Sequence, residues 1–129
     1  MAGDKLAAFA RGKYLSLETY RRTGVPVRTP VWFAEEDRDP STLYIYTELN
    51  AGKVKRIRNN ANVKIAPCTM RGTVKGDWIA ATARLVEGDE SARGHALLNR
   101  KYWPKRLIDF LSPGRRAKLQ IIAIRATGL

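Results

Sequence analysis

The chain has 129 residues and a formal net charge of +12. This length fits one domain over residues 1–129, and the charge indicates an anionic partner, an anionic ligand or both. Cys68 is the only cysteine, which excludes an intrachain disulfide and a cysteine-based zinc cluster and favours a reducing, cytoplasmic compartment. Because no stretch has the apolar length of a signal-peptide core or a membrane span, we expect no membrane insertion.

The N-terminal part of the chain is expected to be helical. Residues 4–11 and 16–23 read as two short helices, the second of them capped by Ser16. Residues 25–34 contain Pro26 and Pro30 and predict an extended strand instead. Since proline has no N–H to donate to a sheet, this strand should lie at an edge or carry a bulge.

A hairpin is predicted over residues 25–48, with the polar segment 35–41 as its turn. A second hairpin should join residues 63–70 to 78–86. We expect a last strand over residues 118–125, whose central apolar run suits burial on both faces.

Two further helices are predicted before that last strand. One begins at Asp89 or Ser91 and ends at Tyr102, and the other spans residues 104–111. Five strands and a possible sixth, joined by short turns, predict a mainly β (α+β) fold built on a small antiparallel barrel with peripheral helices. An open α+β sheet is the alternative.

The most distinctive segment is the basic stretch of residues 52–60, which follows a strand-like run directly. It should form a short helix with Asn50 as its N-cap and with Val54 and Ile57 on one buried face. Free amides at the start of such a helix, together with the helix dipole, suit a phosphate group. A merely solvated basic helix is the alternative. Its four cations are Lys53, Lys55, Arg56 and Arg58.

Catalysis by side chains alone finds little support in this composition. His95 reads as an ordinary surface-helix residue and Cys68 as a small core residue, so no catalytic residue and no metal site are predicted. The acidic segment around Glu35, Glu36, Asp37 and Asp39 reads as a solvated turn. If the protein is an enzyme, a bound cofactor should supply the reactivity.

Four segments together resemble a known superfamily. They are Arg22–Phe33, Leu43–Thr47, Gly52–Asn60 and Val63–Cys68. In order and spacing they look like the pyridoxamine 5'-phosphate oxidase-like, FMN-binding split-barrel superfamily, and most closely its branch of small F420-dependent oxidoreductases. The resemblance implies a six-stranded antiparallel split β-barrel that forms a homodimer and binds a flavin or deazaflavin in an interface groove.

The resemblance also implies which residues bind the cofactor. The strand from Arg28 to Phe33 matches the one that lines the cofactor ring, with Trp32 and Phe33 as candidate pocket walls. Thr47, Gly52 and Lys53 match the phosphate positions, and Lys55 and Arg58 extend the patch toward the tail or the outer phosphate. Trp78 could reach the partner's cofactor. The implied cofactor-binding residues are Arg28, Thr29, Pro30, Val31, Trp32, Phe33, Thr47, Gly52, Lys53, Lys55, Arg58 and Trp78.

Three departures from the superfamily pattern narrow the expected activity. Gly52 stands where the FMN-using oxidase branch has arginine, and the arginine- and histidine-bearing C-terminal motif of that branch is absent, which disfavours pyridoxamine phosphate oxidation. Ala61 replaces a usual proline and affects only one turn. Since F420 carries a polyglutamate tail beyond its phosphate, the excess of cations favours F420 as cofactor, with FMN as the alternative.

The expected activity is hydride transfer from reduced F420 to an electron-poor unsaturated small molecule, with Tyr44, Tyr46 or solvent as the proton donor. Three alternatives stay open. One is an FMN-binding reductase or electron carrier on the same fold, and another is a deazaflavin-binding protein without turnover. The third is a small basic barrel that binds single-stranded nucleic acid, which would need exposed aromatics among its cations. No obligate nucleic-acid partner is expected.

Overall fold

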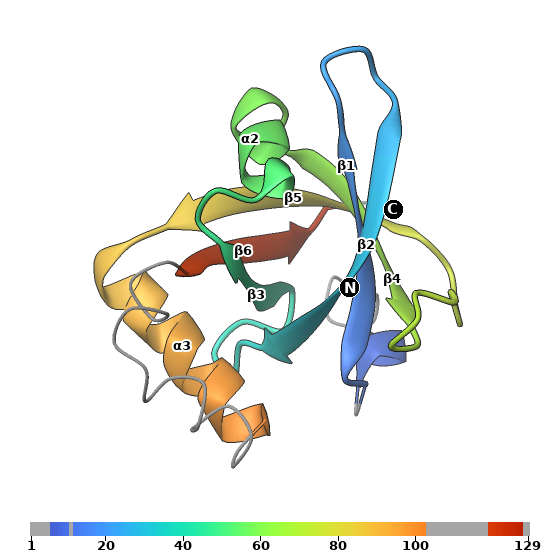
Figure 1. The fold of residues 1–129 in the computed structure, drawn as a ribbon. Coiled ribbons are helices and arrows are strands. Elements are labelled where there is room, and N and C mark those ends of the chain that lie inside the picture. Colours follow the sequence, from blue (N-terminus) through green and yellow to red (C-terminus); the bar gives the residue numbers. More distant parts are fainter. Residues whose placement is uncertain (1–5, 11, 103–118, 128–129) are drawn as a thin grey trace.

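The computed structural model describes residues 6–10, 12–102 and 119–127. Strands dominate this part of the chain, and the helical segments lie outside the sheet (Figure 1). In chain order the elements are η1 (Ala7–Phe9), β1 (Tyr14–Tyr20), β2 (Pro26–Glu35), β3 (Thr42–Glu48), α2 (Gly52–Asn59), β4 (Asn62–Cys68), β5 (Ile79–Val86), α3 (Gly88–Tyr102) and β6 (Leu119–Ala126).

The strands close into one antiparallel barrel. Their order around it is β1, β2, β3, β6, β5 and β4, and each neighbouring pair runs antiparallel. The predicted hairpins are confirmed, because β2 pairs with β3 and β4 with β5. The six-stranded barrel is therefore confirmed, and the open sheet is excluded.

The prediction of a helix over residues 16–23 is wrong, because residues 16–20 belong to β1 and residues 21–23 to the turn that follows it. Leu15 and Leu17 alternate with polar residues and are fully buried, which is the period of a strand. β1 pairs with β2 on one side and β4 on the other, so it supplies the sixth strand. The expected first helix is reduced to the 3-10 turn η1, and the helix predicted over 104–111 lies outside the described residues.

β2 and β3 separate along most of the length of β2. β2 pairs with β1 from Pro26 to Trp32, but its recorded register with β3 covers only Phe33, Ala34 and Glu35. Pro26 and Pro30 thus lie where β2 is paired by β1 alone, as their missing N–H groups require. This separation leaves the barrel split on one side.

Two apolar clusters stabilise the fold. The first fills the barrel and includes Phe9, Phe33 and Ile45, with Ile57 of α2 packed against it. The second lies between the outer face of the barrel and α3, where Tyr44, Leu98 and Ile121 are buried together. α3 is therefore attached to the barrel by its own small core.

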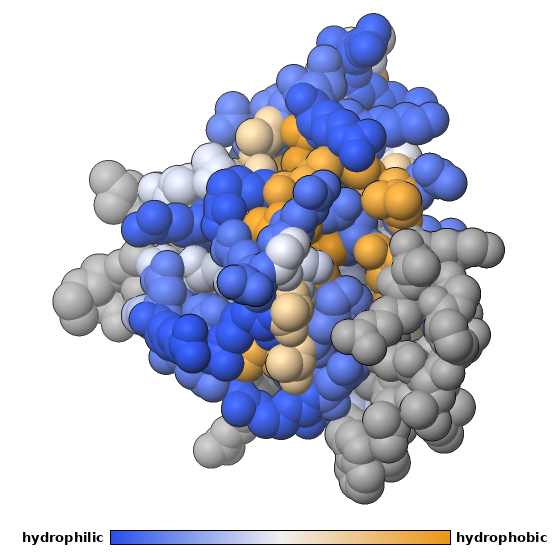
Figure 2. Space-filling model, turned by 90° about the vertical axis from the view of Figure 1, so that its left-hand side faces the viewer, coloured by the Kyte–Doolittle hydropathy of each residue, from blue (hydrophilic) through white to orange (hydrophobic). Residues whose placement is uncertain are grey.

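The molecular surface is largely hydrophilic on the side where both helices lie. Figure 2 shows hydrophobic residues gathered in the upper centre of this face, with hydrophilic residues above and to the left of them. Among the described residues, the large hydrophobic side chains classed as exposed are Val25, Leu49, Met70 and Val74. No helix in the described ranges is long and apolar enough to cross a membrane.

Candidate functional site

A groove opens where β2 and β3 separate. Its cavity volume is about 300 Å³, and residues from β1, β2, β3 and β6 line it. Four of these residues were predicted from the sequence to bind a cofactor: Pro30, Val31, Trp32 and Thr47. The remaining lining residues are Tyr14, Tyr46, Glu48 and Leu119. We call this cavity the β2–β3 groove.

Aromatic rings form one wall of the β2–β3 groove. Trp32 lies between Tyr14 and Tyr46, with ring centroids 6.3 Å and 6.4 Å away and both pairs tilted by 58°. Trp32 also stacks on Tyr102 of α3 at 4.6 Å, with the planes only 8° apart. Since the stack fixes the indole plane, the groove has a rigid aromatic wall that suits a flat ring.

The hydroxyl of Tyr102 binds the backbone where β1 and β2 end their pairing. It accepts a hydrogen bond from the Phe33 N–H at 3.1 Å and lies 2.7 Å from the carbonyl oxygens of both Lys13 and Phe33. Burial raises the pKa of Tyr102, so the phenol stays protonated and can donate to these carbonyls. One hydroxyl thus continues the β1–β2 ladder beyond its last residue pair and links α3 to the aromatic wall.

Lys53 is half-buried and does not line the β2–β3 groove, but its charge interacts with that of Glu48, which does. Thr47 and Glu48 line the groove at the end of β3, and the chain then enters α2, where Lys53 occupies the first turn. Burial lowers the pKa of Lys53, and repulsion from Arg56 lowers it further, while Glu48 opposes the shift. A cation destabilised in this way gains from a bound anion, so an anionic group fits here.

The N-terminus of α2 differs from the prediction in its capping. The N-cap is Ala51, not Asn50, and no side chain caps the helix. Gly52 matters for another reason: a Cβ at this position would lie 2.7 Å from a terminal nitrogen of Arg56. The missing side chain therefore makes room for the Arg56 guanidinium at the first turn. Arg56 Nε also donates to the buried Thr19 hydroxyl at 2.6 Å, so Arg56 is held in place.

Other predicted site residues lie outside the β2–β3 groove. Arg28 binds the buried Glu18 at 2.8 Å, and its guanidinium lies 4.6 Å from the centre of the Trp78 ring. Arg28 and Trp78 therefore contact each other, and neither lines the β2–β3 groove. Phe33 is not a groove wall, because its side chain is fully buried and packs edge-on against Phe9.

The remaining predicted residues are distributed over β2 and α2. Thr29 is half-buried in β2, opposite Leu17 of β1. Lys55 lines a separate cavity of about 200 Å³ beside β1, whereas Arg58 is exposed and lines none of the cavities described in this structure. The four cations of α2 therefore do not all converge on one point, although Lys55 and Arg56 line the same cavity.

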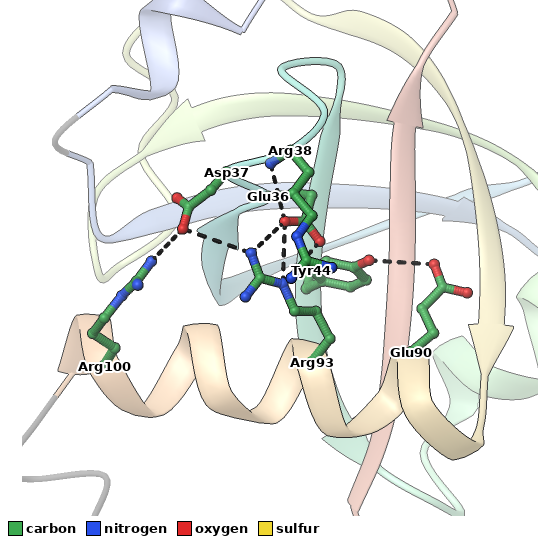
Figure 3. Close-up of polar contacts among 7 residues, drawn as sticks. All are labelled: Glu36, Asp37, Arg38, Tyr44, Glu90, Arg93 and Arg100. Atoms are coloured by element: carbon green, nitrogen blue, oxygen red, sulfur yellow. Dashed lines mark hydrogen bonds and ion pairs between the residues drawn. The ribbon is translucent and has the colours of Figure 1, made fainter.

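The acidic turn after β2 is not simply solvated, which corrects the prediction. Glu36 is 8% exposed and binds Arg93 of α3 at 2.8 Å, while Asp37 binds Arg100 at 2.7 Å (Figure 3). The hydrogen bond from Arg93 is the main reason that the pKa of Glu36 is lowered. The turn thus attaches α3 to the barrel, and we call these ion pairs, with the Tyr44–Glu90 contact, the α3 network.

Tyr44 belongs to the α3 network and not to the β2–β3 groove. Its hydroxyl donates to Glu90 at 3.3 Å (Figure 3), and Arg84 donates to both carboxylate oxygens of Glu90, at 3.1 Å and 2.9 Å. Burial and the nearby carboxylates raise the pKa of Tyr44 to about 12. Of the two tyrosines considered as proton donors, only Tyr46 therefore lines the β2–β3 groove.

Neither residue that simple nucleophilic chemistry would use lies in the groove lining. Cys68 is 2% exposed in β4, where burial raises the pKa of its thiol, which confirms its prediction as a small core residue. His95 lies in α3 as predicted, but it is buried and not on the surface.

Several groove residues were not predicted from the sequence. Tyr14 was missed because β1 was interpreted as helical, although its alternating pattern was a usable signal. Leu119 and Glu48 reach the groove only through the pairing of β3 with β6, which no local pattern reveals. Tyr102 was predicted only as the end of a helix.

Comparison with known proteins supports the fold but identifies no close relative of this chain. No protein-family profile and no curated protein matches the sequence. Among solved structures, HutZ, a heme storage protein from Vibrio cholerae, matches with a TM-score of 0.73 at 16% identity over 98% of this chain and 89% of HutZ. A proposed pyridoxamine 5'-phosphate oxidase from Listeria innocua matches with a TM-score of 0.66 at 18% identity, over 98% of this chain and 94% of that one.

A third structure carries the name F420 reductase. It matches with a TM-score of 0.62 at 19% identity over 95% of this chain and 93% of its own. At such identities the likeness concerns architecture, and proteins on one architecture can bind different cofactors. This chain therefore has the split-barrel fold of pyridoxamine 5'-phosphate oxidase-like proteins, as its resemblance to that superfamily implied.

Proposed function

We propose that this protein is an F420-dependent oxidoreductase that reduces an electron-poor unsaturated small molecule. The observation that carries this proposal is the β2–β3 groove, which has a rigid aromatic wall and, in Glu48, a lining residue whose charge interacts with that of the half-buried Lys53. A flat ring joined to an anionic group matches both features. Reduced F420, when bound, supplies the hydride that such a reaction consumes.

Different residues would bind different parts of the cofactor. Pro30, Val31 and Trp32 of the lining would lie along the ring, while Thr47 of the lining and Lys53 of α2 would hold the phosphate. Lys55 and Arg58 would serve the outer phosphate or the tail. These contacts would fix the cofactor ring so that the acceptor can be placed against it, and correct orientation can contribute roughly 7 to 11 kcal/mol in favourable cases.

The acceptor also needs a proton, because hydride addition leaves it with a negative charge. Tyr46 lines the groove, as Tyr14 does, and solvent is the other source of the proton. Tyr44 is committed to Glu90 in the α3 network.

We further propose that the protein acts as a homodimer. Residues 26–32 of β2 have only β1 as a recorded strand partner, and Leu49, which follows the groove-lining Glu48, is 42% exposed. A second copy could cover this edge and close the groove. Light scattering at several concentrations should give twice the mass of one chain, and a monomer at all concentrations would contradict this part of the proposal.

A titration tests the cofactor directly. F420, FMN and heme are added separately to the pure protein, and binding is followed by calorimetry. F420 should bind with a dissociation constant below about 100 µM, which corresponds to more than roughly 5 kcal/mol. Tight binding of FMN alone would favour the FMN-binding reductase or electron carrier. Binding of heme alone would reject both F420 and FMN as the cofactor.

Turnover provides the second readout. Reduced F420 should be oxidised when an enone or a quinone is added in the presence of the protein. A protein that binds F420 but leaves its absorbance unchanged with every acceptor would be a carrier and not a reductase. The titration and the turnover assay thus separate the binding claim from the catalytic claim.

A further inference from the structure

The loop between β4 and β5, residues 69–78, borders the β2–β3 groove without being part of its lining. It begins directly after Cys68, which pairs with the groove-lining Tyr14 of β1. It then passes the groove-lining Pro30 of β2, because a Cβ on Gly72 would lie 3.9 Å from two ring carbons of Pro30. The loop, which we call the β4–β5 loop, therefore lies along the rim that β1 and β2 form.

The far end of the β4–β5 loop also approaches β2. The guanidinium of Arg28 lies 4.6 Å from the centre of the Trp78 ring, and Arg28 in turn binds the buried Glu18 of β1. Arg28 and Pro30 are two residues apart in one strand, so both lie on the same face of β2. The loop is thus attached at two separate points to the face of β2 that borders the groove.

The tip of the β4–β5 loop is a tight turn of fixed shape. The Gly72 N–H donates to the Thr69 carbonyl and the Thr69 N–H to the Thr73 carbonyl, both at 2.9 Å. The Thr73 N–H also donates to the Thr69 hydroxyl at 3.1 Å. Gly72 has a φ of 90°, a conformation that residues with a side chain rarely adopt. Met70 and Arg71 are the central residues of this turn, so backbone hydrogen bonds hold Met70 at the tip.

Met70 is the most exposed of the large hydrophobic residues that the structure describes. It is 66% exposed, ahead of Val25, Leu49 and Val74. Val74 belongs to the same loop and forms an isolated bridge with Cys68. Two of these four residues therefore lie on the rim of the groove, where an apolar ligand would gain free energy by covering them.

The size of the β2–β3 groove gives this rim a use. Its volume of about 300 Å³ is at the lower end of the range of roughly 300 to 1,000 Å³ that is usual for small-molecule sites. A ring held against Trp32 leaves little room in the groove, so an acceptor stacked on that ring must extend past the lining. Methionine suits contacts at such a rim, because its flexible, polarisable side chain adapts to apolar groups of different shape.

We propose that Met70 is a specificity-determining residue, which contacts an apolar substituent of an acceptor bound in the β2–β3 groove. This inference rests on the proposed function and narrows its substrate class to unsaturated carbonyl compounds that carry an apolar chain beyond the reacting double bond. Val74 supplies a second apolar contact from the same loop.

The first test compares cyclohexenone with a cyclohexenone that carries a hexyl chain next to the double bond, with reduced F420 as the donor. In Met70→Ala, kcat/KM for the hexyl compound should fall about tenfold, and that for cyclohexenone by less than about twofold, because only the hexyl compound loses an apolar contact. Met70→Leu keeps the apolar volume and should retain most of the preference. The affinity for F420 should be unchanged in both variants.

Val25→Ala is the matched control, because it also removes one exposed large hydrophobic side chain, just before the start of β2. Both acceptors should react as with the wild type. An equal loss for the two acceptors in Met70→Ala, or the same selective loss in Val25→Ala, would overturn the proposal. So would light scattering that shows a wild-type dimer and a Met70→Ala monomer, since Met70 would then belong to a subunit interface.

A readout without turnover separates this inference from the proposed function. The sequence has two methionines, Met1 and Met70, so protein labelled with carbon-13 at the methionine methyl groups gives two NMR signals, and Met70→Leu identifies one of them. With oxidised F420 present, the Met70 signal should shift when the hexyl compound is added, and much less with cyclohexenone.

The two readouts together assign any failure. A shifted Met70 signal without oxidation of reduced F420 would reject the proposed function and keep the contact at Met70. An unshifted signal in a protein that does reduce the hexyl compound would reject the contact at Met70 alone. Absence of both the shift and turnover would reject both.

Discussion

Two cavities of similar size are each lined by a tyrosine of β3. Tyr46 lines the β2–β3 groove of about 300 Å³, and Tyr44, two residues earlier, lines a cavity of about 250 Å³ beside α3. The second cavity carries far more charge, yet its buried carboxylate is already paired with Arg93. Charges that are neutralised inside the protein stabilise the fold, whereas a poorly compensated cation such as Lys53 is available to a ligand.

The largest effect on stability is expected from a substitution at Glu36. Glu36→Ala should lower the free energy of unfolding by about 2 kcal/mol, below the roughly 3 to 5 kcal/mol of a fully buried pair, because the Arg93 side chain is 28% exposed. Urea denaturation measures the loss. Cofactor affinity should not change, since Glu36 does not line the β2–β3 groove.

The neighbouring Asp37 provides the matched control. Asp37→Ala also removes one carboxylate from the same turn, but both partners of the Asp37–Arg100 pair are more than half exposed. Its cost should be less than about 1 kcal/mol. Equal losses of unfolding free energy in Glu36→Ala and Asp37→Ala would show that burial of the Glu36–Arg93 pair adds nothing to stability.

A substitution at Tyr102 tests whether α3 and the β2–β3 groove are independent, because Tyr102 belongs to α3 and also stacks on Trp32 of the groove. Tyr102→Phe keeps the ring and removes the hydroxyl that contacts Lys13 and Phe33, so unfolding should become easier by about 1 to 2 kcal/mol. The aromatic wall should loosen as well, which would weaken ring binding. A stability loss with unchanged F420 affinity would mean that the hydroxyl supports only the fold.

Lys53 should give the opposite result to Glu36. Lys53→Ala should weaken F420 about tenfold, or about 1.4 kcal/mol, through a lost charge-assisted phosphate contact, while stability stays near the wild-type value. Calorimetry and urea denaturation measure the two effects. Unchanged affinity would remove Lys53 from the site. Because burial lowers the pKa of Lys53 below the usual 10.5, wild-type affinity should also fall as the pH rises toward that lowered pKa.

The smallest effect is expected from mild acid. The pKa values of Glu36 and Glu90 are both lowered from the ordinary 4.5, in each case mainly by a hydrogen bond from an arginine. Their stabilisation is therefore complete above the unfolded-state pKa and is lost as the pH falls through the folded-state pKa. The unfolding midpoint should drop in this window for the wild type, and by a smaller amount for Glu36→Ala.

The sequence allowed the fold to be predicted more fully than the site. Residues 52–60 were recognisable as a helix because Val54 and Ile57 recur at helical spacing, and the strands after residue 25 are largely apolar segments separated by turn-forming or helical ones. β1 was missed because a serine that can cap a helix received more weight than the alternation of Leu15 and Leu17. Capping preferences are local, whereas β1 is stabilised by two neighbouring strands that the local pattern does not show.

The site depends still more on distant pairing. Trp32 and Thr47 were found because they lie in segments with a recognisable order, but Tyr14 and Leu119 reach the groove from strands far apart in the sequence. The role of the acidic turn was missed for the same reason, since Arg93 follows Glu36 by 57 residues. Composition indicates that these charges exist, and only the packing of α3 decides which of them are buried.

The lack of a side chain at Gly52 links residue 52 to residue 56, two positions that look independent in the sequence. Any side chain at residue 52 must displace the guanidinium of Arg56, because the added Cβ would lie 2.7 Å from it. Residues 52 and 56 should therefore change together during evolution: glycine at the first position permits a folded-back arginine one turn later, and a larger residue requires a shorter or outward-pointing partner. A survey of natural variants that found the two positions uncorrelated would show that Arg56 readily adopts another rotamer.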